Sequence, residues 1–245
     1  MVSKRKLKFI KSLQLKKYRK KEQCFLVEGT KSVLELLASD YQIQQLLVSP
    51  SFLEQHHIHM NGYNGDLTEV KAADLQGLGT LKSNQEALAV VVCKPNQPLE
   101  LQTQEYALAL DRIRDPGNLG TIIRIADWYG IDKVVCSTDC AELYNPKVIQ
   151  ATMGSFTRIN TYYGNLVEYL DKNEHVYGAC MDGIDVHDVE FERGGIIVIG
   201  NESQGIALAL EPKINTRITI PKYGAAESLN AAAAAAVICD VLRGR

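Results

Sequence analysis

The 245-residue sequence contains no apolar run that approaches the ~20 residues a helix needs to cross a bilayer. Its charged N-terminus is not followed by the apolar stretch of a signal peptide. The six cysteines are scattered and form no CxxC pair, a usage typical of a reducing compartment. From these absences we expect a cytoplasmic protein that has no membrane segment.

Several site motifs are also missing. The sequence has neither the phosphate-binding loop of nucleoside triphosphatases nor a GxGxxG fingerprint, so a nucleoside triphosphate site is not supported. His56, His57 and His59 cluster in a polar stretch that lacks acidic or cysteine ligands at a suitable spacing. Cys136 and Cys140 are four residues apart, which favours free thiols over a zinc site. We therefore expect no bound metal.

The composition is that of a globular protein, with 46% apolar residues, but the charge is unevenly distributed. Residues 1–22 carry ten lysines and arginines against one acid, a net charge of +9. Residues 23–245 carry 17 basic and 28 acidic residues, a net charge of −11. A basic arm on an acidic body indicates an anionic polymer as partner, and a solvated, frayed N-terminus is the alternative.

Alternating strand and helix patterns predict a small α/β domain over residues 1–94. A basic helix is predicted over 3–21, and a clear buried strand over 87–92. Residues 95–103 contain two prolines and no periodicity, which predicts a linker between domains.

Residues 104–245 again alternate strands and helices, which predicts a mostly parallel sheet with helices on both faces. The pattern includes a helix opened by Asn145-Pro146 that runs to about Thr152, a strand over 175–180 and a helix near 205–210. The predicted strand 196–199 runs into a loop rich in Gly, Asn, Ser and Glu over 200–205. The predicted strand 216–220 leads to Ser228-Leu229-Asn230 and an alanine-rich helix, for which Ser228 could simply be the N-cap. Ligands bind at the carboxyl ends of strands in such sheets, so both loops are candidate site elements.

A further candidate lies on the helix that Asn118 is expected to cap and that runs to about Tyr129. Arg124 stands there among isoleucines, and a charge in so apolar a segment needs a partner or an opening to solvent. A structural ion pair with Asp127 or Glu202 is one interpretation. The other is that its planar guanidinium holds a phosphate or a reacting group.

No single motif decides between these interpretations, but the order of three groups does. The groups are Asn118-Leu119-Gly120 with Arg124 six residues after the asparagine, Gly200-Asn201-Glu202-Ser203-Gln204-Gly205 after a strand, and Ile220-Pro221 followed by Ser228-Leu229-Asn230-Ala231. This order resembles the SpoU (TrmH) family of S-adenosylmethionine-dependent RNA ribose 2′-O-methyltransferases in the SPOUT superfamily. The resemblance covers about residues 104–245. The N-terminal part resembles the family's small substrate-binding domain through Phe25-Leu26-Val27-Glu28-Gly29 and Leu88-Ala89-Val90.

The resemblance implies a deep trefoil knot in the C-terminal domain and a homodimer whose active site lies at the subunit interface. It implies a catalytic group of Arg124, Asn118, Glu202, Ser228 and Asn230. It implies that S-adenosylmethionine is bound by Gly200, Ile220, Leu229, Cys180, Met181 and Asn201. The RNA backbone would be contacted by the basic segment, through Lys4, Arg5, Lys8, Lys16, Lys17 and Arg19.

In this family the arginine at the position of Arg124 is the base or activator of the ribose hydroxyl. A free guanidinium has a pKa above about 12 and is a poor base at neutral pH, so positioning is the role that chemistry favours. The sequence departs from many relatives at Lys222-Tyr223, where an apolar residue is common.

The family leaves the RNA target open, with ribosomal RNA expected from the two-domain organisation and transfer RNA as the alternative. A non-catalytic RNA-binding or ribosome-assembly factor on the same fold is a second alternative. A small-molecule α/β enzyme with a nucleotide cofactor is a third, although it leaves the basic arm unexplained.

Overall fold

The computed structural model describes residues 3–81 and 83–244 and divides into two compact units. The first comprises residues 1–95 together with 144–157, and the second comprises 96–143 together with 158–245. Residues 93–105 contain no helix or strand. No sequence pattern indicated that a segment from the middle of the chain would return to the first unit.

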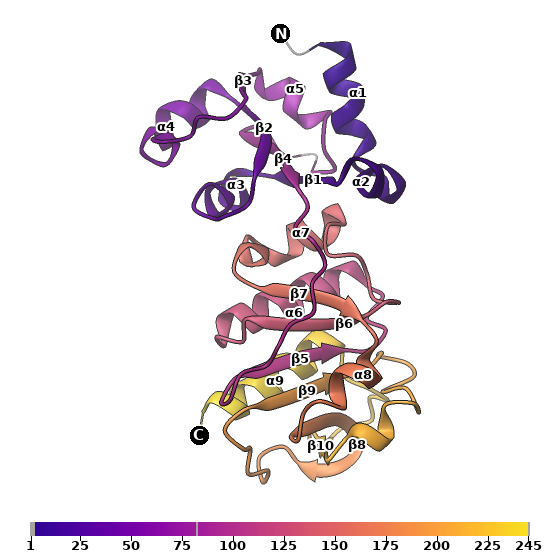
Figure 1. Cartoon of the computed structure of the whole chain (residues 1–245). Helices are drawn as coiled ribbons and strands as arrows, with labels where there is room; N and C mark the ends of the chain where they lie inside the picture. The colour runs from indigo at the N-terminus through magenta and orange to yellow at the C-terminus, as the bar shows by residue number, and fades with distance from the viewer. Residues whose placement is uncertain (1–2, 82, 245) are drawn as a thin grey trace. The chain divides into compact units, whose positions relative to one another are not determined.

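The first unit is a four-stranded mixed sheet with helices around it (Figure 1). The sheet has the order β1-β4-β2-β3, in which β4 runs antiparallel to both neighbours and β3 runs parallel to β2. Its strands and helices are α1 (Lys4–Ser12), α2 (Lys16–Glu22), β1 (Cys24–Glu28), α3 (Thr30–Leu37), β2 (Ile43–Val48), α4 (Pro50–Met60), β3 (Leu67–Glu69), α5 (Ala72–Gln76), β4 (Ala87–Val92), α7 (Pro146–Thr152) and the 3₁₀ turn η1 (Ser155–Thr157).

The basic N-terminal segment forms two helices, so the prediction of one helix over 3–21 was wrong. The chain turns between α1 and α2, which lets Ile10 and Leu13 enter the core of the first unit. Arg19 is only 3% exposed, and its Nη1 donates to the carbonyl oxygens of Leu13 (3.0 Å) and Gln14 (2.8 Å). These carbonyls lie just after α1, where no helical N–H is available to them. A buried arginine thus stabilises the break.

Aromatic packing explains why residues 144–157 belong to the first unit. The ring of Phe25 in β1 lies 4.4 Å from that of Tyr144 and 5.9 Å from that of Phe156, measured between centroids. Tyr41 packs edge-on against Phe156 at 5.5 Å. Such aromatic pairs contribute about 0.5–1.5 kcal/mol each beyond the area they bury.

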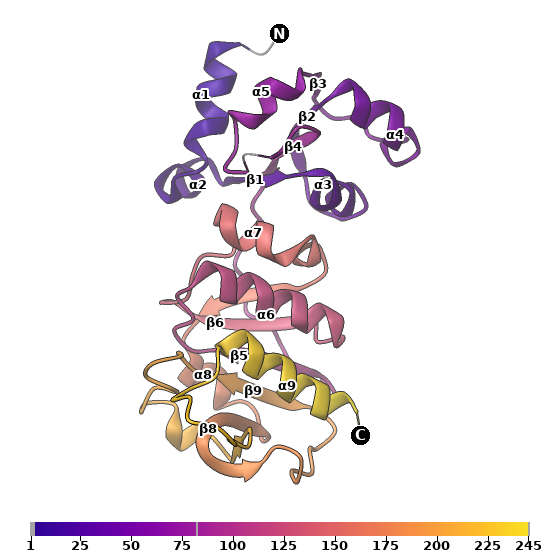
Figure 2. The same ribbon diagram turned by 180° about the vertical axis from the view of Figure 1, so that it is seen from behind.

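The second unit is built on a six-stranded sheet in which every neighbouring pair is parallel, so the prediction of a mostly parallel sheet is confirmed. The strand order is β10-β8-β9-β5-β6-β7. The helices α6 and α9 lie side by side on one face of the sheet and α8 lies on the other (Figures 1 and 2). The elements are β5 (Tyr106–Leu110), α6 (Pro116–Trp128), β6 (Lys133–Ser137), β7 (Asn160–Gly164), α8 (Leu166–Leu170), β8 (Val176–Asp185), β9 (Gly195–Ile199), the 3₁₀ turn η2 (Glu211–Lys213), β10 (Thr216–Thr219) and α9 (Ala231–Arg243).

The core of this sheet comes from short apolar strands. In β9 all five residues are buried, and in β5 the four residues after Tyr106 are buried. Strands buried on both faces are typical of parallel sheets covered by helices. In the described part of the chain, no helix is long and apolar enough to cross a membrane.

Strand order reverses at the centre of this sheet. From β5 the chain moves outward to β6 and β7, and it then returns to the other side of β5 to add β8 and β9. The carboxyl ends of β5 and β9 therefore lie at a switch point of the topology, where open α/β sheets bind ligands. A ligand-binding site is therefore expected at this edge of the sheet.

Candidate active site

Three residues distant in the sequence meet near the switch point. The side-chain amide of Asn118 donates through Nδ2 to Glu202 Oε1 in a short hydrogen bond. Asn230 Nδ2 donates to Asn118 Oδ1 at 2.9 Å. The structure thus brings together three of the five predicted catalytic residues, one from each of the three motifs.

The local role predicted for Asn118 was wrong. Asp115 is the N-cap of α6, and its Oδ1 accepts from the backbone N–H of Asn118 at 2.8 Å. Pro116 occupies the first turn, a position it favours because it needs no N–H partner there. Asn118 lies inside the first turn, so its side-chain amide does not cap the helix. This amide instead bridges Glu202 and Asn230.

Asn230 has the capping role that Ser228 could have filled. Its Oδ1 accepts from the backbone N–H groups of Ala232 (2.9 Å) and Ala233 (3.3 Å) at the start of α9. One side chain therefore fixes the start of this helix and reaches Asn118. Ser228 and Leu229 are exposed, on a stretch without helix or strand between β10 and α9. Within the described residues the hydroxyl of Ser228 makes no hydrogen bond.

Arg124 lies on α6, and its side chain is exposed. The structural ion pair that was one interpretation of this residue is not formed, because Asp127 is paired with Arg158 (2.8 Å) and Glu202 accepts from Asn118. Among the described residues, Arg124 has no hydrogen bond or ion pair. Water can hydrate the guanidinium of Arg124 because the side chain is exposed, and the guanidinium is available to a ligand.

The loop after β9 is very tightly folded. A Cβ at Gly200 would lie under 3.0 Å from backbone atoms of Gly205 and Ile206, so only glycine fits. Gly205 has a φ of 65° and closes the turn, and Asn201 and Gly205 exchange backbone hydrogen bonds of 2.8 and 3.1 Å. The two ends of the loop therefore lie in direct contact, and no side chain fits at position 200.

The side chain of Asn201, one of the predicted donor-binding residues, is already engaged within this region. Its Oδ1 accepts from the backbone of Ser203 (3.0 Å) and Gln204 (3.2 Å), and its Nδ2 donates to the carbonyl of Arg112 (3.0 Å). The side chain of Asn201 thus stabilises the loop, and only its backbone would contact a ligand.

Cys180 and Met181 lie within β8, which extends to Asp185 instead of ending at Cys180 as predicted. The pairing with β10 skips from Gly178 to Ile184, so residues 179–183 form an irregular stretch opposite β10. Met181 is exposed, whereas burial raises the pKa of the half-buried Cys180 thiol. Ile220, directly after β10, is half-buried.

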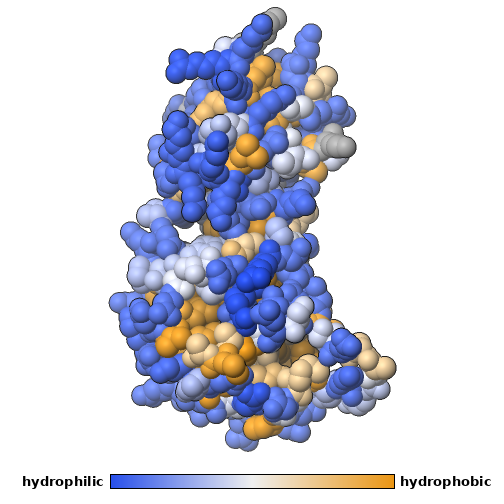
Figure 3. All heavy atoms as spheres, turned by 90° about the vertical axis from the view of Figure 1, so that its right-hand side faces the viewer, coloured by the Kyte–Doolittle hydropathy of each residue, from blue (hydrophilic) through white to orange (hydrophobic). Residues whose placement is uncertain are grey.

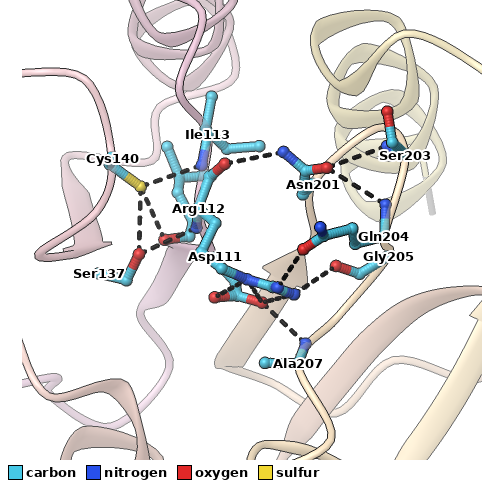
Figure 4. A network of polar contacts seen from close by, with 11 residues as sticks. Asp111, Arg112, Ile113, Ser137, Cys140, Asn201, Ser203, Gln204, Gly205 and Ala207 are labelled. Carbon is cyan, nitrogen blue, oxygen red and sulfur yellow. Dashed lines mark hydrogen bonds and ion pairs between the residues drawn. The ribbon is translucent and has the colours of Figure 1, made fainter.

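A polar network that sequence reasoning did not single out lies beside the tight loop (Figure 4). It joins the loop after β5, through Asp111 and Arg112, to the end of β6 and to the loop after β9. The side chain of Asp111 is 5% exposed. The only available sequence signal was an aspartate directly after a buried strand, since its partners are up to 96 residues away.

Two thiols lie at the end of β6 next to this network. A hydrogen bond from Cys136 lowers the pKa of the Cys140 thiol to about 7, with help from Ser137 and from the backbone N–H of Ile113 (3.2 Å). The same contact and burial raise the pKa of Cys136. No group of three or more His, Cys, Asp or Glu side chains in the described ranges is placed to hold a metal ion.

The predicted RNA-contacting residues fall into two groups. Lys4, Arg5, Lys8, Lys16 and Lys17 are exposed on α1 and α2. Hydrophilic side chains predominate on the face seen in the upper part of Figure 3, with apolar patches between them. Arg19 is buried and bound to carbonyl oxygens, which corrects its assignment as an RNA contact. Periodicity could not separate it from the lysines because its partners lie in the turn between α1 and α2.

Comparison with known proteins agrees with this architecture. Residues 105–240 match the SpoU rRNA Methylase family, and residues 4–89 match the MRM3-like substrate binding domain. The chain is 33% identical over 244 residues to the 23S rRNA (guanosine(2553)-2′-O)-methyltransferase RlmP of Bacillus subtilis (strain 168), covering 98% of this chain and 96% of that protein.

Two solved structures are similar over essentially the whole chain. A TrmH-family protein from Porphyromonas gingivalis superposes with a TM-score of 0.88 at 32% identity, covering 100% of this chain and 99% of the other. An rRNA methyltransferase from Sinorhizobium meliloti, solved with AdoMet bound, superposes with a TM-score of 0.88 at 26% identity, covering 100% and 97%.

Proposed function

The chain belongs to the SpoU rRNA methylase family, and we propose that it transfers the methyl group of S-adenosylmethionine to a ribose 2′-hydroxyl of ribosomal RNA. The observation that carries the proposal is the meeting of Asn118, Glu202 and Asn230 at the switch point, with Arg124 exposed on the same helix as Asn118. Ribosomal RNA is favoured over transfer RNA because RlmP of Bacillus subtilis, which this chain matches along nearly its whole length, is named for 23S rRNA.

The tight loop fits a bound methyl donor. Gly200 carries no side chain and is half-buried where the two ends of the loop pack together, and Ile220 and Leu229 follow on loops of the same unit. We assign donor binding to the backbone at these three positions and at residues 180–181. When bound, S-adenosylmethionine supplies a methyl group activated by its sulfonium charge.

The protein's own task is to position a weak nucleophile. A ribose hydroxyl must lie in line with the methyl carbon and must lose its proton as the new C–O bond forms. Arg124 holds this hydroxyl and a neighbouring phosphate through its planar guanidinium, a geometry suited to phosphate oxygens. The hydrogen-bonded group of Asn118, Glu202 and Asn230 fixes the first turn of α6, and Ser228 stands exposed on the loop before α9 to contact the nucleotide.

We further propose a homodimer with the site at its interface. Trp128, the one tryptophan of the sequence, is 82% exposed on α6, four residues after Arg124. The neighbouring helix α9 carries half-buried Ala233, Ala236 and Val237. An exposed aromatic on one helix and small apolar residues on the neighbouring helix support close helix packing between two copies.

The remaining features are proposed on the same basis. Residues 1–94 would bind RNA, 95–103 would link the domains, and 104–245 would form a methyltransferase domain tied in a trefoil knot. The return of β10 to the outer side of β8 and of α9 to α6 supports the knot. A ribosomal RNA substrate supports a cytoplasmic location.

The function is tested by incubating the purified protein with S-adenosylmethionine and unmodified ribosomal RNA and mapping ribose methylation. The expected result is one methylated 2′-hydroxyl in ribosomal RNA and none in transfer RNA added at equal mass. Methylation of transfer RNA alone would contradict the ribosomal assignment, and methylation of neither would contradict the enzymatic one.

The exposed lysines of the basic helices should contribute to RNA affinity, whereas the buried Arg19 should contribute to stability. Replacing exposed Lys8 with alanine should lower the slope of log K against log salt concentration by about 0.7–0.9, the loss of one phosphate contact. Replacing buried Arg19 should instead destabilise the fold by about 2 kcal/mol, because charged hydrogen bonds to two carbonyls are lost. Filter binding at several salt concentrations and urea unfolding measure the two effects, and an unchanged unfolding midpoint for Arg19→Ala would contradict the structural role.

A further inference from the structure

Arg112 lies two residues after the end of β5 and has an unusual backbone conformation. Its φ is 56°, in the left-handed region that a long side chain seldom adopts. Both of its backbone polar groups are bound by side chains of neighbouring elements. Its N–H donates to Ser137 Oγ at 2.9 Å, and its carbonyl accepts from Asn201 Nδ2 at 3.0 Å. The end of β6 and the loop after β9 thus hold Arg112 in this conformation.

The guanidinium of Arg112 joins a buried carboxylate to the tight loop (Figure 4). Its Nε and Nη2 donate to the carboxylate of Asp111 at 3.0–3.2 Å. Nη1 donates to Gln204 Oε1 at 2.6 Å, and Nη2 donates to the carbonyl of Gly205 at 3.1 Å. Asp111 Oδ2 also accepts from the backbone N–H of Ala207 at 2.8 Å.

The loop over residues 200–207 is therefore held from two sides. Arg112 and Asp111 bind Gln204, Gly205 and Ala207, while on the other side Asn118 binds Glu202. Gly200 packs against the backbone of Gly205, so a shift at one end of the loop moves the other end. The conformation of this loop determines both where its backbone faces a ligand and where Glu202 points.

We propose that Arg112 is a positioning residue for methyl transfer. Together with Asp111 it holds loop 200–207 in the shape that binds the methyl donor and presents Glu202 to Asn118. Arg112 acts through Gln204 and Gly205 and not by contact with the reacting atoms. This inference rests on the function proposed above, since that function assigns the loop to the donor.

The alternative is an ion pair that only stabilises the fold, and kinetics separate the two. Arg112→Ala should raise the KM and the Kd for S-adenosylmethionine about tenfold, because charged hydrogen bonds that fix the loop are lost. Gln204→Ala removes one exposed hydrogen bond and leaves the ion pair between Arg112 and Asp111 intact. It should raise the KM and the Kd for S-adenosylmethionine about threefold. Arg112→Lys keeps the charge beside Asp111 but lacks the planar fork, and it should lie between wild type and Arg112→Ala.

The double variant Arg112→Ala/Gln204→Ala provides a coupling test. If Arg112 acts through Gln204, the double variant should bind S-adenosylmethionine no more weakly than Arg112→Ala alone. The matched control is Arg158→Ala, which removes an arginine bonded to Asp127 at 2.8–3.1 Å elsewhere in the same unit and should leave the Kd unchanged.

Calorimetric binding of S-adenosylmethionine and thermal unfolding are measured on every full-length variant, beginning with wild type. A wild-type protein that does not bind S-adenosylmethionine would refute the proposed function. Normal wild-type binding together with unchanged binding in Arg112→Ala would refute the positioning role alone, whatever the melting temperature. Should Arg112→Ala fail to fold, Gln204→Ala decides, since an unchanged Kd in that folded variant would also refute the role.

Discussion

Replacing Arg124 with alanine is expected to lower kcat for RNA methylation by about 10³-fold, the scale seen when a group that orients or stabilises the reacting centre is lost. The Kd for S-adenosylmethionine and the melting temperature should stay close to wild type. The structural reason is that the side chain is exposed and, within the described residues, forms no hydrogen bond or ion pair that the fold would lose. Single-turnover methylation and calorimetric binding measure the two quantities.

Two controls accompany this prediction. Arg124→Lys keeps the positive charge but not the planar fork, and it should recover only a small part of the activity. Arg158→Ala removes another arginine of the same unit and should retain full activity. An Arg124→Ala protein that methylates RNA within a few-fold of the wild-type rate would show that this residue neither activates nor positions the substrate.

Replacing Gly200 with alanine should weaken binding of S-adenosylmethionine by between about tenfold and a hundredfold, equivalent to the 1–3 kcal/mol typical of overpacking. The added methyl group would lie under 3.0 Å from backbone atoms of Gly205 and Ile206, and backbone cannot rotate aside as a side chain can. The loop must therefore open, which moves the surface assigned to the donor.

Gly77→Ala is the matched control, because a Cβ at Gly77 would meet nothing within 4 Å. This variant should bind S-adenosylmethionine as wild type does. Equal affinities for Gly200→Ala and wild type, measured by calorimetry, would remove loop 200–205 from the donor site.

The sheet of the second unit could be predicted because its strands are short, continuous apolar runs separated by helical patterns. The strand predicted over 196–199 is β9 with one residue added, and the helix predicted from Asn145-Pro146 to about Thr152 is α7. Turn and cap residues signal such boundaries because their hydrogen bonds join residues that are close together in the sequence.

Features set by distant contacts could not be predicted. The break between α1 and α2 depends on the buried Arg19, whose partners are five and six residues earlier. Periodicity alone predicted one continuous helix across this break. The helix expected near 205–210 is absent, and this stretch is irregular up to η2, beside the hydrogen bond of Ala207 to Asp111. The attachment of residues 144–157 to the first unit depends on rings far apart in the sequence.

For the candidate site, motif order predicted which residues lie together better than local rules predicted which residue caps each helix. Asn118, Glu202 and Asn230 meet, although Asp115 caps α6 in place of Asn118. The pairing of Arg112 with a loop 92 residues away has no local signal at all.

The measurement that tests the central claim most directly is a map of 2′-O-methylation across ribosomal and transfer RNA from cells with and without the gene for this protein. The account predicts that one ribose of ribosomal RNA loses its methyl group, and that the wild-type gene restores it whereas the Arg124→Ala gene does not. An unchanged methylation map would contradict the account and favour a non-catalytic RNA-binding protein on this fold.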